Sequence, residues 1–274
     1  MSLLESLLAA TPRFSERPAP FGPFHLISVG IILALFVLLV ILRKRLPRGE
    51  RALRRGLLIF GVGLLLLEIG KQLAYSYDPL SGWSYNWDRF PFQFCSTPIY
   101  AALVGMCLPA GRFRQALLNF LATYSPVAGC AVLFYPTPDV FHEIVFLDVH
   151  TMLWHGVMLL FGLYLWLSEA VTPSVKTALT AAAVYAPMPC IALCLNELEM
   201  ALGFAGEYTF NMFYISRDGL CRIPVLSWFQ QNTPYPMFFA AYLVALGLGG
   251  ALVTLGMGVI RFAWKKTKKT PEMA

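Results

Sequence analysis

The chain has 274 residues, of which 58% are hydrophobic and 13% are charged, and its mean hydropathy is +0.63. A soluble domain carries about a quarter charged residues, so this composition excludes water as the main solvent of the folded chain. The net charge of +6 does not indicate a nucleic-acid partner, because the basic residues lie in short runs beside apolar segments, as they do at membrane edges.

Seven windows satisfy the requirement of a membrane-spanning helix for about 20 predominantly apolar residues. In chain order they are residues 21–42, 56–75, 92–109, 115–135, 149–167, 175–195 and 237–260. The sequence therefore predicts an all-α fold, a polytopic transmembrane bundle of about seven helices that occupies residues 21–260.

Lysine and arginine concentrate on one side of these windows. With the N-terminus outside, the inner segments hold fifteen of these residues and the outer segments five, and Lys71 lies within a helix. Cytoplasmic edges carry the excess of positive charge. We therefore expect a multi-pass protein of the plasma membrane, with residues 1–20 as an extracytoplasmic tail and residues 261–274 as a basic cytoplasmic tail.

The six cysteines show no CxxC spacing, and five of them fall in apolar segments. A disulfide scaffold and a zinc ribbon are therefore not indicated, and we expect no metal and no cofactor. Most of these cysteines are expected to pack as small hydrophobic residues between helices.

Cys95 is the exception that the sequence singles out. The third window begins PFQFCSTP, which places Gln93 and Cys95 about one turn below the outer surface. Pro98 removes a backbone donor, so we expect it to kink this helix beside Cys95. Polar residues within membrane helices are costly and are therefore candidates for function.

The fifth window enters from the outside through DVHTMLWHG. We expect Asp148 to cap this helix, His150 to lie at the membrane interface and His155 to lie about two turns deep. The two histidines are about 140° apart around a helix, so they do not form an HxxxH metal pair. His155 is either a satisfied core histidine or a general acid and base.

Other polar residues are predicted at the same level of the bundle. Glu68 and Lys71 are three residues apart and lie on one helix face. They form either a structural ion pair or a charged pair that orients a catalytic group or a lipid headgroup. Together with these two, the candidate substrate-binding residues in the outer half are His25, Gln93, His150, Asn196, Asn211 and Tyr235. This one-sided clustering predicts a site in the outer half of the bundle.

The order of several motifs resembles the YwaF-like integral membrane proteins of bacteria. These motifs are FGPFHLISV, PFQFCSTPIY, a His-Gly pair, YTFNMFYISR and a Pro-Tyr pair. That family is similar to a eukaryotic transmembrane acyltransferase of ether phospholipids that is thought to use a cysteine and a histidine. The resemblance implies that the nucleophile is Cys95 and the histidine is His155, with His150 as the alternative, and that Asn211 is the family's loop asparagine.

Two functions remain open at this point. In the first, Cys95 and His155 lie side chain to side chain and transfer an acyl chain between membrane lipids, and Gln93, Asn211 or Lys71 stabilises the oxyanion. In the second, the outer polar cluster binds or transports a small solute. A metal site formed by Cys95, His155 and Glu68 is a weaker third interpretation, because no ligand spacing supports it.

Overall fold

The computed structural model describes residues 1–267, and nearly all of its regular structure is helical. The helices are α1 (Leu3–Ala9), α2 (Pro23–Ile41), η1 (Leu42–Lys44), α3 (Glu50–Ser76), η2 (Trp87–Arg89), η3 (Phe94–Ser96), α4 (Thr97–Cys107), α5 (Arg112–Phe134), η4 (Pro138–Val140), α6 (Val145–Leu167), α7 (Val175–Tyr185), α8 (Pro187–Leu202), η5 (Met212–Tyr214), α9 (Pro224–Asn232) and α10 (Tyr235–Thr267). A short antiparallel hairpin joins β1 (Tyr77–Asp78) to β2 (Gly82–Trp83). Of the predicted basic tail, residues 261–267 continue α10, and residues 268–274 lie outside the described residues.

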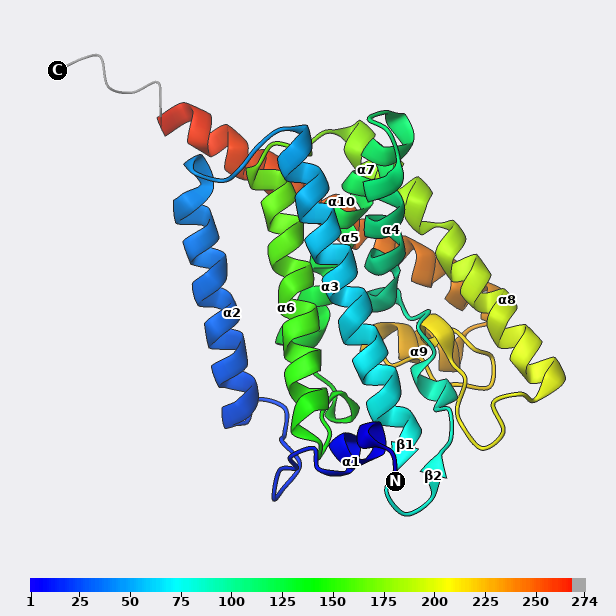
Figure 1. Cartoon of the computed structure of the whole chain (residues 1–274). Coiled ribbons are helices and arrows are strands. Elements are labelled where there is room, and N and C mark those ends of the chain that lie inside the picture. The colour runs from blue at the N-terminus through cyan, green and yellow to red at the C-terminus, as the bar shows by residue number, and fades with distance from the viewer. Residues whose placement is uncertain (268–274) are drawn as a thin grey trace.

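The predicted all-α polytopic bundle is confirmed. Within residues 1–267, six helices are long and apolar enough to cross a membrane, and they correspond to α2, α3, α5, α6, the α7–α8 pair and α10. The segment predicted as the third span is a shorter apolar helix, Phe94–Cys107, which runs beside α3 within the bundle (Figure 1). The N-terminus and the described end of α10 lie at opposite ends of the bundle.

The expected kink at Pro98 is wrong. The chain forms a 3₁₀ turn over Phe94–Ser96, and α4 starts at Thr97, so Pro98 occupies its first turn. The first turn tolerates proline because its backbone N–H groups have no partner within the helix. The consequence is that Cys95 precedes α4 and does not lie one turn inside it.

The centre of the bundle is formed by α5 and α6, which are the most buried of the six spans. Small residues let these two helices approach closely. A Cβ atom added at Gly129 of α5 would lie 2.6 Å from the backbone oxygen of His155, and one added at Gly162 of α6 would lie 2.3 Å from Pro126. The contact at Gly129 therefore fixes the position of the His155 backbone.

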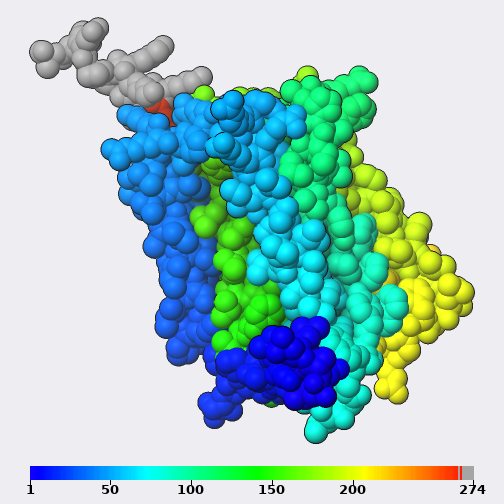
Figure 2. Space-filling model, viewed as in Figure 1, coloured from blue at the N-terminus to red at the C-terminus, as the bar shows by residue number. Residues whose placement is uncertain are grey.

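The end of the bundle that bears the N-terminus is covered by several segments. Helix α1 lies across this end (Figure 2), and its Glu5 accepts a hydrogen bond from Trp83 Nε1 at 3.0 Å. Arg17 donates hydrogen bonds to the backbone oxygens of Pro138 and Phe141. The loop between α8 and α10 folds onto the bundle as well, since Phe213 and Ile215 have no exposed surface.

The orientation of the bundle is a prediction that reporter fusions test. We expect a reporter fused after Ala274 to be cytoplasmic, because the basic residues of the chain gather at the end of the bundle where α10 ends. One fusion carries a fluorescent protein that folds only in the cytoplasm, and a second carries a phosphatase that is active only outside it. The active reporter identifies the side of the membrane on which the C-terminus lies. An external C-terminus would contradict both the orientation and the outer placement of the polar cluster.

Candidate functional site

A cavity of about 230 Å³ lies where α3 ends and where α4 and α6 begin. The loop between α8 and α10 contributes to its wall through Tyr214 and Ile223. The side chains that line it and carry polar atoms are Lys71, Tyr75, Asp88, Arg89, Gln93, Cys95, Ser96, Asp139, His150, Thr151, Trp154, His155, Tyr214 and Tyr242. Both residues of the predicted catalytic pair therefore line one cavity, together with Lys71 and Gln93.

Cys95 is a free thiol at the N-terminal side of α4. Its backbone carbonyl accepts a hydrogen bond from Trp154 Nε1 on α6, with an N···O distance of 3.1 Å. This bond joins the turn that carries Cys95 directly to the helix that carries both histidines. The dipole of α4 favours negative charge near its N-terminus, so the position suits a group that becomes an anion during reaction.

His155 has one ring nitrogen without a hydrogen-bond partner among the described residues. Its Nδ1 lies 2.8 Å from the backbone oxygen of Thr151, and because a carbonyl oxygen only accepts, Nδ1 carries the proton. Nε2 then holds the lone pair, and it is buried and has no hydrogen-bond partner among residues 1–267. No hydrogen bond joins Cys95 to His155 within these residues, although both line the same cavity.

His150 lies nearer the start of the same helix and lines the same cavity. Its ring stacks on Trp154, with 5.1 Å between centroids, and its Nε2 also has no partner among the described residues. Both histidines therefore remain candidates for the base.

Two expectations about this helix are wrong because α6 begins at Val145, four residues earlier than predicted. His155 therefore lies about three turns into the helix, not two. Asp148 does not cap it: the N-cap residue is Ile144, and Asp148, fully buried, accepts a hydrogen bond from the backbone N–H of His142 at 2.6 Å. Asp148 thus holds the connection that precedes α6.

Glu68 and Lys71 form an ion pair in the structure. Lys71 Nζ lies 2.7 Å from Glu68 Oε1, and the two side chains are 16% and 6% exposed. Gln72 Nε2 donates to the same carboxylate oxygen at 2.7 Å, whereas Glu68 Oε2 has no partner among the described residues. Lys71 lines the cavity with Cys95, while Glu68 lines a separate hollow beside α4 and β2.

Gln93 and Asn196 hold the backbone of the loop between α8 and α10. Gln93 Nε2 donates to the backbone oxygen of Asn211 at 2.9 Å, and its Oε1 accepts from the backbone N–H of Phe213 at 2.8 Å. Asn196 makes the corresponding pair of bonds with the backbone of Met212, at 3.1 and 2.8 Å. Gln93 still lines the cavity, whereas Asn196 does not.

Asn211 and Tyr235 hold the same loop and do not line the cavity. The Asn211 amide accepts from the backbone N–H of Ser216 at 2.9 Å and donates to the backbone oxygen of Leu220 at 3.2 Å. The Tyr235 hydroxyl donates to the backbone oxygen of Ile215 at 2.6 Å. The structure therefore gives both side chains a supporting position around the loop.

His25 also lies away from the cavity. Its Nδ1 accepts a hydrogen bond from the backbone N–H of Phe21 at 3.0 Å, and its Nε2 lies 3.0 Å from the backbone oxygen of Leu133. Both ring nitrogens are therefore used to fasten the start of α2 to the end of α5.

Tyr214 and Arg89 are two of the lining residues that the sequence did not single out. Tyr214 follows Phe213, and both have a positive φ, 57° and 58°, which is costly for side chains of this size. Burial raises the pKa of Tyr214 to about 12, so its hydroxyl stays protonated at neutral pH. Neither a phenylalanine nor a tyrosine signals such a backbone conformation in a sequence.

Arg89 is the second of these residues. Its guanidinium lies over the Tyr75 ring, 4.6 Å from the centroid, and its buried Nε has no partner among the described residues. Arg89 lines both the cavity and an adjoining hollow of about 140 Å³ that is also lined by Arg222. Within residues 1–267, no group of three or more His, Cys, Asp or Glu side chains is placed to hold a metal ion.

Comparison with known protein families identifies the family of this chain. Residues 20–255 match the family described as the TMEM164 family, whereas no curated protein and no solved structure matches the chain. The match spans most of the 274 residues and includes every residue that lines the cavity. The chain therefore belongs to the TMEM164 family and is a multi-pass membrane protein.

Proposed function

We propose that this protein is a membrane-embedded lipid acyltransferase that uses Cys95 as nucleophile and His155 as base. The observation that carries the proposal is the shared cavity, which is lined by Cys95, a free cysteine, and by His155, together with Lys71 and Arg89. The Nε2 atom of His155 is buried and has no hydrogen-bond partner among residues 1–267. A free thiol has a pKa of about 8.5 and is mostly protonated at neutral pH, so a nucleophilic cysteine needs such a base nearby.

The reaction has two halves. His155 Nε2 takes the thiol proton, the Cys95 thiolate attacks the carbonyl carbon of a phospholipid ester, and the C–O bond to the glycerol oxygen breaks as the imidazolium returns the proton to that oxygen. The product is an acyl thioester on Cys95 and a lysolipid. The hydroxyl of a second lipid then loses its proton to His155 and attacks the thioester, and the C–S bond breaks as the thiolate regains the proton.

Lys71 is the best-placed donor for the oxyanion. The ion pair with Glu68 uses one of the three hydrogens of its ammonium group, so the other two remain for a substrate oxygen. The amide of Asn211 is engaged with loop backbone on both sides and lies outside the cavity. Gln93 lines the cavity, but its amide already holds the loop, which makes it the second choice.

Arg89 supports a phosphate-bearing substrate. A guanidinium binds phosphate oxygens through its fixed fork of donors, and Arg89 lies between the cavity and the adjoining hollow that Arg222 also lines. The cavity of about 230 Å³ has room for the ester and glycerol part of a lipid, so the acyl chains would extend into the bilayer. With the N-terminus outside, the substrates would come from the outer leaflet.

The resemblance to the bacterial YwaF-like proteins, and through them to a eukaryotic acyltransferase of ether phospholipids, supports the same reaction. It assigns the nucleophile to Cys95 and the histidine to His155 or His150. The partners in this proposal are therefore membrane lipids, with no nucleic acid and no cofactor.

A covalent intermediate is the sharpest test. We expect purified protein incubated with a phospholipid that carries an alkyne-tagged acyl chain to acquire the tag on Cys95, and hydroxylamine to remove it because thioesters are cleaved by this nucleophile. Peptide mass spectrometry locates the tag. The adduct should be absent in Cys95→Ser and retained in Cys130→Ser, a partly buried cysteine of α5 that does not line the cavity.

The same experiment separates catalysis from solute binding. Absence of any adduct under conditions where the protein turns lipid over would contradict a cysteine nucleophile. Absence of both adduct and turnover, with binding of a small solute at the cavity, would favour a transporter or binding protein.

A further inference from the structure

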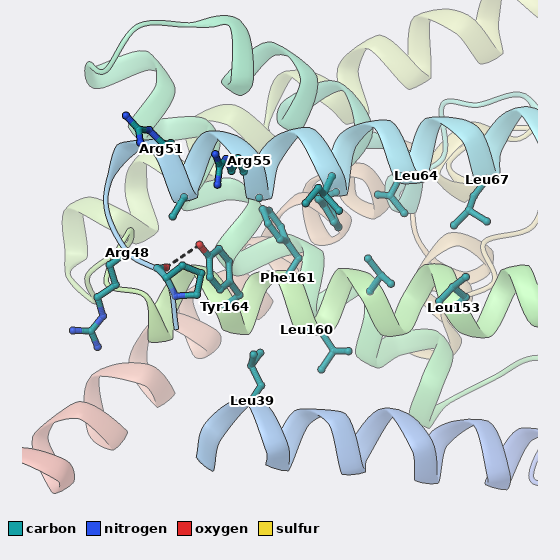
Figure 3. Close-up of a pocket in the computed structure, with 17 residues that line it drawn as sticks. Leu39, Arg48, Arg51, Arg55, Leu64, Leu67, Leu153, Leu160, Phe161 and Tyr164 are labelled. Atoms are coloured by element: carbon teal, nitrogen blue, oxygen red, sulfur yellow. Dashed lines mark hydrogen bonds between the residues drawn. The ribbon is translucent and has the colours of Figure 1, made fainter. Parts of the chain in front are cut away.

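A long apolar groove runs along the bundle between α2 and α3, with α6 as its floor (Figure 2). Its volume is about 810 Å³, and it shares no lining residue with the cavity described above. Leu64 and Leu67 of α3 line one side of the groove, Leu153 and Leu160 of α6 line its floor, and Leu39 of α2 lines the opposite side (Figure 3).

The groove is open because α2 packs on α6 and leans away from α3 (Figure 1). Glycines deepen it: Gly56 and Gly63 of α3 both line the groove, and a Cβ atom added at Gly63 would meet nothing within 4 Å. The lining is almost entirely apolar along its length, so it suits hydrocarbon chains and not a polar solute.

One end of the groove is basic. Arg48, Arg51 and Arg55 line this end (Figure 3), and it lies where α2 and α3 are joined. Arg48 has a distant ion pair with Glu169, at 3.7 Å. Within residues 1–267, no ion pair involves Arg51 or Arg55.

The contrast with a neighbouring arginine shows that these charges are not needed to hold the fold. Arg54 binds Glu50 and donates to the backbone oxygens of Met106 and Leu108 at 2.8 and 3.1 Å, so it joins α3 to α4. Arg51 and Arg55 are exposed on the same helix, and neither takes part in these contacts with α4. The groove end is further shaped by Tyr164, whose hydroxyl donates to the backbone oxygen of Pro47 at 3.2 Å.

We propose that this groove binds one anionic glycerophospholipid, with its phosphate at Arg51 and Arg55 and its acyl chains along α3 and α6. Basic side chains at a membrane edge attract anionic headgroups, and here the charge stands at the mouth of an apolar channel. From Ala52 to Leu67 the groove extends about 22 Å along α3, which exceeds half of the roughly 30 Å hydrocarbon core. The length therefore matches acyl chains that reach the bilayer centre from that edge.

Lipid retention in native mass spectrometry tests the proposal. We expect the full chain in a neutral detergent to retain phosphatidylglycerol more tightly than phosphatidylcholine with the same acyl chains. Arg51→Gln with Arg55→Gln should lower the affinity for phosphatidylglycerol by about 10- to 30-fold. Lys44→Gln with Arg45→Gln is the matched control, since it removes the same charge at the end of α2 from residues that do not line the groove.

A second pair of variants tests the apolar part. Gly63→Leu should displace the chains and weaken binding, and its new side chain has open space to enter. Gly30→Leu is its control, because Gly30 is exposed on α2, has the same open surroundings and does not line the groove. Equal retention of the two lipids, equal losses in both double variants, or unchanged binding in Gly63→Leu would each overturn the proposal.

Discussion

Replacing Cys95 by serine is expected to remove nearly all acyl transfer and to leave the fold intact. An alcohol ionises far less readily than a thiol, and the exchange of sulfur for oxygen changes little of the packing around the turn that precedes α4. His155→Ala should lower the rate by about 10²- to 10⁴-fold, the usual contribution of a general base. Transfer of a labelled acyl chain from a phospholipid to a lysolipid in proteoliposomes measures both effects.

The combined variant distinguishes a working pair from two independent residues. If Cys95 and His155 act as a unit, the loss in the double variant should be close to that of Cys95→Ser alone, because the second change removes nothing further. His150→Ala is the informative comparison, since this histidine lines the same cavity and also has an unpartnered nitrogen. A larger loss in His150→Ala than in His155→Ala would transfer the role of base to His150.

The architecture was predictable from the sequence because the bilayer leaves few alternatives. Backbone polar groups in lipid must be satisfied within a helix, so apolar windows locate the spans. Their ends were less predictable. α6 begins before Asp148 because that carboxylate binds the preceding loop instead of capping the helix, and Pro98 starts a helix that it was expected to kink.

The position of a polar residue along the bundle was predictable from the order of the helices, whereas the direction of its side chain was not. The polar residues predicted for the outer half divide in the structure into two groups. Some line the cavity, among them Lys71, Cys95 and His155, and others hydrogen-bond to backbone, such as Asn196 and Asn211. Hydropathy indicates where a residue lies along the length of its helix, but not which way the helix is rotated. The sequence therefore did not distinguish residues that line the cavity from residues that hydrogen-bond to backbone.

The number of basic residues in the predicted outer segments indicated topology but did not identify any one of them as a site residue. Arg89 counted as one of five outer basic residues, yet its guanidinium reaches the cavity over the ring of Tyr75. Tyr214 is brought there by a loop whose conformation depends on bonds from Gln93 and Asn196, far away in the sequence. Local patterns do not contain such long-range contacts.

Lys71→Ala is expected to lower the free energy of unfolding by roughly 3–5 kcal/mol, because it leaves a buried carboxylate without its counter-charge. Glu68 is 6% exposed in its side chain and keeps a single donor, Gln72 Nε2, on the oxygen that Lys71 would vacate. Replacing both charges, Glu68→Gln with Lys71→Met, should cost less than Lys71→Ala, since neither buried charge then remains. Reversible unfolding in mixed micelles measures the differences.

A double-mutant cycle of Glu68→Gln, Lys71→Met and their combination answers one question, and the activity of the combined variant answers another. Additive losses of stability would mean that the two side chains do not interact, in contradiction to the 2.7 Å contact. If Lys71 also stabilises the oxyanion, Glu68→Gln with Lys71→Met should still lose acyl transfer by about 10²-fold or more even where its stability is restored. Full activity in that stable variant would assign the pair a purely structural role and would leave Gln93 as the remaining donor proposed for the oxyanion.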